Sequence, residues 1–345
     1  MNPSVHSGRL NRTPSVPAQP DQAFTLTELL VVVGTLAVLA LLLVPALAGT
    51  KTDSWRIQCQ NNQKQLQVGF SLFAQDHNEM FPAAGYQSSG GVLTWDSWVY
   101  TYIGGGQNVT VSQAAMGVYA LNTNDAAVLG LAVGLPVVAC PVDATLPKIN
   151  WMHVNGDPTA PLQFAPRTYA MNSAGSSWGV DFQVDPQSGK YPLPDLNQPG
   201  RHGVGIYWQS SDATPDWDAK GYKTSVVKDP GGTILLCEVA SSQGCMGNIW
   251  PCTCLGPQTS NGSANGFGNL YQIDTAAPTD AAHLYSGGYS EGGLLYPAHG
   301  NRFNYLFHDG HVAALKIEDT VGTASGTPLL KLTYPKGMWT VVPGD

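Results

Sequence analysis

Four residues near the C-terminal end carry imidazole or carboxylate groups that could bind a metal ion: His299, His308, Asp309 and His311. Such ligands together suit zinc or another transition ion. Against this, Asp309 and Gly310 form the dipeptide that accepts the positive φ angles of a type I′ turn, and apolar-rich runs flank them, so residues 301–316 are predicted to form a β-hairpin. His299 would then reach the turn and hydrogen-bond to its backbone or to Asp309. We favour this structural role and expect no cofactor, with His299, Asp309 and His311 as the candidate ligands if a metal is bound.

A second candidate for chemistry is Ser290, because Gly288-Tyr-Ser-Glu-Gly292 fits the G-x-S-x-G pattern of a nucleophile elbow. The elbow requires a buried strand before the serine and a helix after it. Here glycines stand on both sides, which predicts a flexible loop. We therefore do not expect an enzyme.

Tryptophans are scattered through a region of strong turn signal that covers residues 83–230 and offers little other chemistry: Trp95, Trp98, Trp151, Trp178, Trp208 and Trp217. They could line a groove for a sugar or a peptide. Packing in the core of a glycine-rich domain is the interpretation that we favour.

The N-terminal part is dominated by an apolar run from Leu29 to Ala48. As a helix this run is about 30 Å long, the thickness of the hydrocarbon core of a bilayer. Glu28 directly precedes it, and a carboxylate costs roughly 2.5 to 3.5 kcal/mol at mid-membrane and less near the surface. The macrodipole at a helix N-terminus favours a negative charge by about 0.3 to 1 kcal/mol. The run is therefore predicted to be a single membrane span with Glu28 at its boundary.

The residues Ala23-Phe24-Thr25-Leu26-Thr27-Glu28-Leu29-Leu30 closely resemble the cleavage and methylation site of type IV prepilins and pseudopilins. The resemblance implies that prepilin peptidase removes residues 1–23 and that Phe24 becomes the N-methylated N-terminus. It also implies that Glu28 pairs with the α-amino group of Phe24 in a neighbouring subunit, and that Pro45 bends the helix.

The chain departs from that family at Ala23, where glycine is usual. Alanine is also small, so we expect cleavage to proceed. A competing interpretation is a Sec signal peptide, with Arg9 and Arg12 as its basic region and Ala46-Leu47-Ala48 as its cleavage site. That would place the mature N-terminus at Gly49 and would leave the arrangement of phenylalanine and glutamate unexplained.

The helix is predicted to continue beyond the membrane, over residues 24–78 in all. Apolar and small residues recur at steps of three and four, which is typical of an amphipathic helix: Trp55, Cys59, Asn62, Leu66, Gly69 or Phe70, and Phe73. The segment Asp76–Pro82 is predicted to end the helix, because Pro82 disfavours a helical conformation at Phe81.

Further motifs resemble those of pilin-like proteins of the planctomycete and verrucomicrobial type that carry an H-x9-DG motif. They follow one another along most of the chain: Arg56–Pro82, Val138–Pro141, Arg167–Asn172, Thr233–Glu238, and His299 with Asp309-Gly310 after nine residues. Thr233–Val239 also reads as a buried strand by its continuous apolar run, which contains Glu238, an acid without an assigned role.

Six cysteines would lie outside the cytoplasm if the anchor has its N-terminus inside: Cys59, Cys140, Cys237, Cys245, Cys252 and Cys254. An oxidising compartment favours disulfides. We expect Cys59 on the long helix and Cys140 in the V-A-C-P motif to form one, worth about 3 to 5 kcal/mol. The other four could instead bind zinc, although their spacing lacks the usual C-x2–4-C knuckle.

The net charge is −8, and removal of residues 1–23 leaves 14 basic and 23 acidic residues. Nucleic-acid binding needs a basic surface, so we expect no nucleic-acid partner. With 39 glycines, 25 prolines and only 12% charged residues, the chain is predicted to be rich in loops.

Together these features predict an α+β, pilin-like chain: a leader over 1–23, a helix over 24–78 with a span at about 29–48, and a loop-rich antiparallel β-sheet domain over 79–345. The expected function is a subunit of a type II secretion pseudopilus or type IV pilus-like filament, with prepilin peptidase and other pilin subunits as partners. Before assembly it would cross the bacterial inner membrane once, with the C-terminal domain periplasmic. The alternative is a non-polymerising, membrane-anchored binding protein for polysaccharide or metal.

Overall fold

The structure is a computed structural model that describes twelve stretches of the chain: residues 25–88, 91–105, 135–160, 162, 164–172, 203–209, 216–248, 252–254, 299–300, 302–324, 327–328 and 337–341. Within them, the side chains of residues 43–52 and of a few single positions are left out. The chain divides into two compact units, Met1–Thr50 and Lys51–Asp345.

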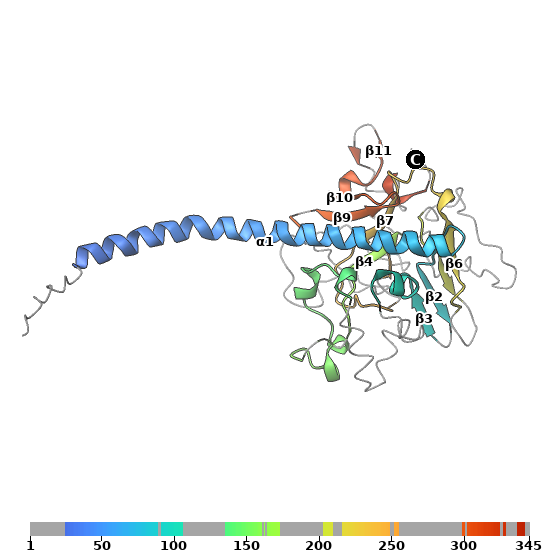
Figure 1. Cartoon of the computed structure of the whole chain (residues 1–345), viewed down its shortest axis with the longest axis horizontal. Helices are drawn as coiled ribbons and strands as arrows, with labels where there is room; N and C mark the ends of the chain where they lie inside the picture. Colours follow the sequence, from blue (N-terminus) through green and yellow to red (C-terminus); the bar gives the residue numbers. More distant parts are fainter. Residues whose placement is uncertain are drawn as a thin grey trace, which may run out of the picture. The chain divides into compact units, whose positions relative to one another are not determined.

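The longest element is helix α1, which runs from Leu26 to Asp76 (Figure 1). Thr25 and Glu28 form a capping box at its start. The backbone N–H and the hydroxyl of Thr25 donate to Oε2 of Glu28 at 2.9 and 2.7 Å, and the N–H of Glu28 donates to the Thr25 hydroxyl at 3.3 Å. This reciprocal arrangement satisfies N–H groups that a helix start leaves unpaired.

No helix among the described residues is long and apolar enough to cross a membrane. The predicted span at 29–48 includes residues 43–48, whose side chains the structure does not describe. The span therefore stays a prediction.

In the second unit, α1 has one buried side. Its buried residues recur at helical spacing and include Cys59, Asn62, Gln63, Leu66, Gly69, Phe70, Phe73 and Ala74. The helix ends at Asp76, well before Pro82, because Asn78 and Glu79 adopt positive φ angles of 55° and 61°. The N–H of Glu79 then donates to the carbonyl of Ala74 at 2.8 Å. A left-handed C-terminal cap, rather than the proline, stops the helix.

The described residues also form the short α-helix α2 and a series of short strands (Figure 1). Their bounds are α2 Trp95–Val99, β1 Met80–Pro82, β2 Gly85–Ser88, β3 Gly91–Thr94, β4 Tyr169–Asn172, β5 Tyr207–Gln209, β6 Lys220–Lys223, β7 Ile234–Glu238, β8 Thr253–Cys254, β9 Phe303–Phe307, β10 Val312–Leu315, β11 Thr323–Ala324 and β12 Thr327–Pro328. Single turns of 3-10 helix occur between them, for example at Pro136–Val138 and Asp143–Thr145.

The main sheet has five strands in the order β10-β9-β7-β4-β8, and a second sheet has the order β3-β2-β5. Most neighbours are antiparallel, but β4 pairs with β8 and β2 with β5 in parallel. The sheets are therefore mixed, whereas the sequence predicted an antiparallel sheet. Two-stranded pairs β1-β6 and β11-β12 complete the described strands.

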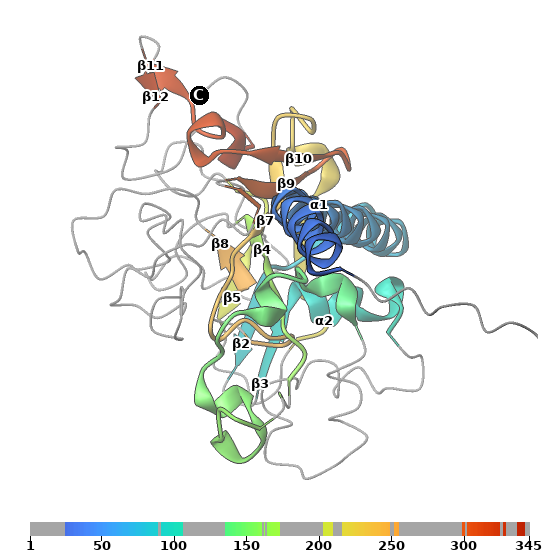
Figure 2. The same ribbon diagram turned by 90° about the vertical axis from the view of Figure 1, so that its left-hand side faces the viewer.

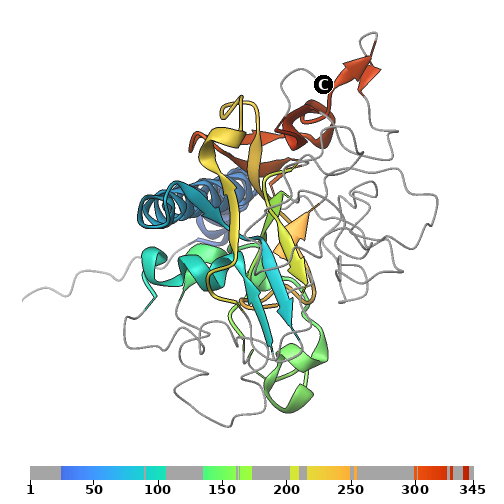
Figure 3. The same cartoon turned by 90° about the vertical axis from the view of Figure 1, so that its right-hand side faces the viewer.

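Both faces of the main sheet are covered, which explains why β4, β7 and β9 are buried along their whole length. One face joins the core that contains Leu66 and Phe70 of α1, and the other packs with Trp339. Figures 2 and 3 show the part of α1 that belongs to the second unit lying between α2 on one side and β9 and β10 on the other.

Strands β9 and β10 form an antiparallel hairpin around Asp309 and Gly310. Only Gly310 has a positive φ, at +94°, and its N–H donates to the carbonyl of Phe307 at 2.9 Å. The predicted type I′ turn needs positive φ at both central residues, so that detail was wrong. One left-handed glycine after an ordinary tight turn closes the hairpin instead.

Candidate functional site

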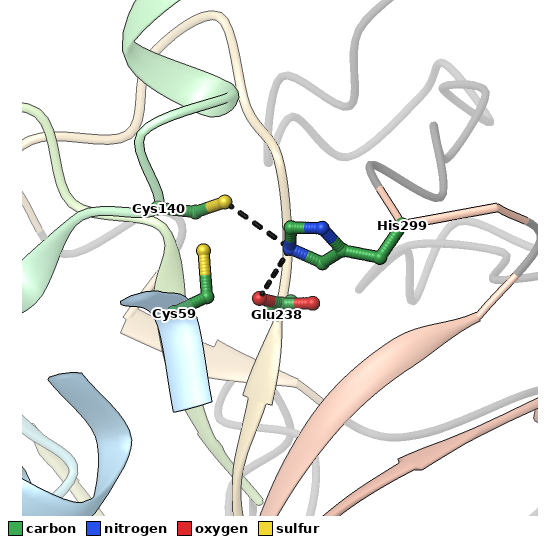
Figure 4. A group of neighbouring side chains, drawn as sticks. All are labelled: Cys59, Cys140, Glu238 and His299. Carbon is green, nitrogen blue, oxygen red and sulfur yellow. Dashed lines mark hydrogen bonds and ion pairs between the residues drawn. The ribbon is translucent and has the colours of Figure 1, made fainter. Parts of the chain in front are cut away.

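Four side chains that can ligate metals meet in the interior of the second unit: Cys59, Cys140, Glu238 and His299 (Figure 4). We call them the Cys-Glu-His cluster. Their ligand atoms, one from each residue, all lie within 4.8 Å of one another. All four residues are buried, with exposed fractions of 0 to 5%.

The four residues come from different parts of the fold. Cys59 lies on α1, and Cys140 follows the 3-10 turn at Pro136–Val138. Glu238 is the last residue of β7, and His299 lies shortly before β9. Each belongs to one of the motifs that the sequence analysis singled out, so those motifs meet in space at this cluster.

His299 is at the centre of the geometry (Figure 4). Its Nε2 lies 3.4 Å from Sγ of Cys140 and 3.3 Å from Oε1 of Glu238. Its other ring nitrogen, Nδ1, is buried and has no hydrogen-bond partner among the described residues. Cys59 and Cys140 are not joined by a disulfide in the structure, although their sulfur atoms are neighbours. The predicted disulfide stays a prediction.

Glu238 is held by strand β9. The backbone N–H of Asn304 donates to Oε2 of Glu238 at 2.7 Å, and Nδ2 of Asn304 donates to Oε1 at 2.9 Å. Asn304 is fixed in turn by α1, because Gln60 donates to its Oδ1 at 3.2 Å and Gln63 donates to its backbone carbonyl at 3.0 Å. The carboxylate is therefore oriented by contacts that also attach α1 to the sheet.

The two cysteines are positioned through β4 and the residue before it. The backbone N–H of Cys140 donates to the hydroxyl of Thr168 at 2.8 Å, and that hydroxyl donates to buried Asp143 at 2.8 Å. The hydroxyl of Tyr169 donates to the backbone carbonyl of Cys59 at 3.3 Å. Both thiols are thus anchored through their backbones, and their sulfur atoms are left to face the cluster.

The cluster shifts the pKa values of its members. Burial opposes the charged imidazolium, but the hydrogen bonds to Cys140 and Glu238 and the charge of Glu238 outweigh it and raise the pKa of His299 to about 10. Burial also works to raise the pKa of Cys140, yet hydrogen bonds from Cys59 and His299 lower it overall. The hydrogen bond to Cys140, together with burial, raises the pKa of Cys59 far above its usual range. Without a metal, these shifts favour a protonated His299 and make Cys140 the more easily deprotonated of the two thiols.

The predicted contact of His299 with the hairpin turn is wrong, because its described contacts are with Cys140 and Glu238. Asp309 and His311 instead bond to each other at 2.7 Å on the exposed hairpin tip. Neither belongs to a group of three potential ligands in the part of the chain that the structure describes. Of the histidines and the aspartate first considered as metal ligands, only His299 enters the cluster.

The remaining cysteines do not form one site among the residues described. Cys237 and Cys254 are hydrogen-bonded neighbours, and Cys245 packs with Met152 and Phe164. Cys252 belongs to the main core. The alternative that these four cysteines bind one zinc ion is therefore wrong.

Several other predicted site residues can be placed only in part. Ala23, Phe24 and Ser290 lie outside the described residues. Glu28 caps α1 in the first unit, and α1 continues through Pro45, of whose side chain nothing is described. Trp95, Trp98 and Trp208 are buried in the main core, as expected for packing residues.

Sequence reasoning missed the role of Glu238. It is an acid at the end of an otherwise apolar strand, which marked it as unusual without showing its partners. It also missed two buried ion pairs, Lys148 with Asp143 at 2.8 Å and Arg167 with Asp96.

No protein-family model, curated protein or solved structure matches this chain. The cluster is therefore interpreted through its own chemistry. Two sulfur atoms, an imidazole and a carboxylate in a closed, buried space can hold a metal ion, or the two cysteines can oxidise to a disulfide.

Proposed function

We propose that this chain is a structural subunit of a type II secretion pseudopilus or type IV pilus-like filament, inserted in the inner membrane and cleaved after Ala23 by prepilin peptidase. The observation that supports it best is helix α1. It is one helix from Leu26 to Asp76 that is apolar and exposed in its first part, while its residues from Lys51 onward belong to the β-rich unit.

The exposed apolar side chains in the first part of α1 require a partner surface that shields them from water. Its large apolar side chains are 45 to 79% exposed: Leu26, Leu29, Leu30, Val31, Val32, Val33, Leu36, Val38, Leu39, Leu41 and Leu42. Exposing a contiguous apolar surface to water is unfavourable, and such surfaces mark membrane or protein contacts. Lipid would cover these side chains before assembly, and the helices of neighbouring subunits would cover them in a filament.

Glu28 offers a test, because its two roles can be separated. Within the chain it caps α1 together with Thr25. Between subunits its charge would pair with the α-amino group of Phe24. A glutamine in place of Glu28 can still complete the capping box, but it carries no charge.

The experiment compares three variants for membrane insertion, leader removal and sheared surface filaments. Glu28→Gln should insert and be cleaved but assemble poorly, because the intersubunit charge pair is lost. Thr25→Ala keeps the charge and loses the cap, so it should still assemble. Glu28→Ala should fail to assemble as Glu28→Gln does.

Normal assembly of Glu28→Gln together with failure of Thr25→Ala would show that Glu28 only caps the helix. Absence of filaments and of subunit crosslinks from the wild-type chain would favour the membrane-anchored binding protein instead.

A further inference from the structure

We infer that Cys59, Cys140, Glu238 and His299 form a structural binding site for a zinc-type divalent cation that fastens α1 to the main sheet. The inference rests on the geometry of the second unit and does not depend on filament assembly.

The spacing fits four ligands around one ion. Zinc binds sulfur at about 2.3 Å and nitrogen or oxygen at about 2.0 to 2.2 Å, so neighbouring ligand atoms of a tetrahedral site lie roughly 3.3 to 3.8 Å apart. Nε2 of His299 lies 3.3 Å from Oε1 of Glu238 and 3.4 Å from Sγ of Cys140. All four ligand atoms fit within 4.8 Å of one another.

The same distances fit a metal-free hydrogen-bonded group less well. A charge-assisted bond from an imidazolium to a carboxylate is typically about 2.7 to 2.9 Å long, shorter than the contact with Glu238. Nε2 of His299 also carries at most one hydrogen, yet it lies within 3.4 Å of two polar atoms, Sγ of Cys140 and Oε1 of Glu238. If the three atoms are ligands of a metal ion, no hydrogen is needed between Nε2 of His299 and its two neighbours.

Charge balance also favours a cation. The cluster contains three groups that become anionic as ligands, in a region that excludes water. Isolated buried anions are costly. The two buried cations described nearby are already paired, Lys148 with Asp143 and Arg167 with Asp96. A divalent ion would offset the charge of the three anionic ligands, in place of the proton that His299 carries in the metal-free chain.

The donor set selects the class of metal. Two thiolates with an imidazole and one carboxylate suit zinc and similar borderline ions, whereas magnesium and calcium prefer oxygen ligands. Four protein ligands and almost complete burial leave no open position for a substrate. The site is therefore of the closed, structural kind.

Residues around the cluster hold its members in place through hydrogen bonds. Asn304 orients Glu238 through two hydrogen bonds, and Thr168 fixes the backbone of Cys140. Nδ2 of Asn62 on α1 also donates to the carbonyl of Ala139, the neighbour of Cys140, at 3.0 Å. Such outer contacts orient metal ligands and tune their affinity.

The test uses the full-length chain, purified in detergent from its membrane without chelators. Metal analysis should find about one zinc ion per chain. After removal of the metal under reducing conditions, Co²⁺ should give the intense visible absorption of tetrahedral thiolate coordination, and Zn²⁺ should displace it.

Variants locate the site. Cys140→Ser, Glu238→Gln and His299→Gln should each lose the bound metal, whereas Cys245→Ser, which alters an equally buried cysteine outside the cluster, should keep it. The cobalt spectrum of the wild-type chain tests the site even where a variant fails to fold.

Two results would overturn the inference. One is a Cys59–Cys140 disulfide in the isolated chain without bound metal. The other is failure of the reduced wild-type chain to take up Zn²⁺ or Co²⁺.

Discussion

Asn304 on β9 binds the carboxylate of Glu238 on β7 with two hydrogen bonds, one from its backbone N–H and one from its side-chain amide, at 2.7 and 2.9 Å. Gln60 on α1 donates to the side-chain oxygen of the same asparagine, and Gln63 on α1 donates to its backbone carbonyl. Asn304 therefore joins α1, β7 and β9 through hydrogen bonds. The orientation of Glu238 therefore depends on the attachment of the helix.

Asn304→Leu should weaken metal binding without removing a ligand. The new side chain has a similar volume but cannot donate to Oε1 of Glu238, so zinc affinity should fall by about 10- to 100-fold. Competition with a chromophoric chelator measures this. Asn61→Ala, on the exposed side of α1, is the matched control and should bind zinc as the wild type does. Unchanged affinity of the Asn304→Leu variant would mean that Asn304 does not position the ligand.

Zinc binding should release protons, because the raised pKa of His299, about 10, and the raised pKa of Cys59 leave both groups protonated in the metal-free chain at neutral pH. Ligands must lose these protons, so zinc binding should release at least the protons of these two groups per ion, and affinity should rise with pH. Calorimetry in buffers of different ionisation enthalpy gives the number. Binding without proton release would contradict the described protonation of the cluster.

Arg167→Met should destabilise the fold strongly. It leaves Asp96 of α2 buried without its ion pair, although Thr94 and Gly247 still donate to that carboxylate. Losing one partner of a buried pair costs about 3 to 5 kcal/mol of unfolding free energy. Denaturant unfolding measures the loss, and adding Asp96→Asn should recover part of it. A cost below about 1 kcal/mol, typical of exposed pairs, would refute this interpretation.

His308 should make stability fall in mild acid. Its burial lowers its pKa to about 4 despite the nearby charge of Asp309, and its ring packs on Phe81 with centroids 4.5 Å apart. The unfolded chain takes up a proton below about pH 6.5 while the folded chain does not, so stability is lost as the pH falls from 6.5 towards 4. The loss amounts to about 3 kcal/mol at most. His308→Phe should remove this part of the pH dependence of the unfolding free energy, measured by denaturant unfolding between pH 4 and 7. Equal slopes for the two chains would show that His308 is not the group responsible.

The sequence allowed local features to be predicted from local signals. Leu66 and Phe70 repeat at helical spacing and are buried in α1, and Asp309-Gly310 marks the end of the β9–β10 hairpin. The sequence also predicted that Cys59 and Cys140 lie close together, although it predicted a disulfide between them.

Other features depend on contacts between distant segments, which leave no local pattern. The parallel pairing of β4 with β8 is one example, since their residues lie far apart along the chain. Glu238 is another example. Its role depends on Cys140 and His299, which lie far away in the sequence and are brought next to it by the fold. His299 was assigned to the nearby turn because sequence proximity was the only available guide.

The proposal of a pilin-like subunit is tested most directly by the N-terminus of the mature chain. Fragment mass spectrometry of protein from membranes or filaments, in cells that contain prepilin peptidase, should find a chain that begins at N-methylated Phe24. A chain that begins at Gly49 would identify the apolar run as a secretory signal peptide, and an uncleaved chain that keeps residues 1–23 would equally contradict the proposal.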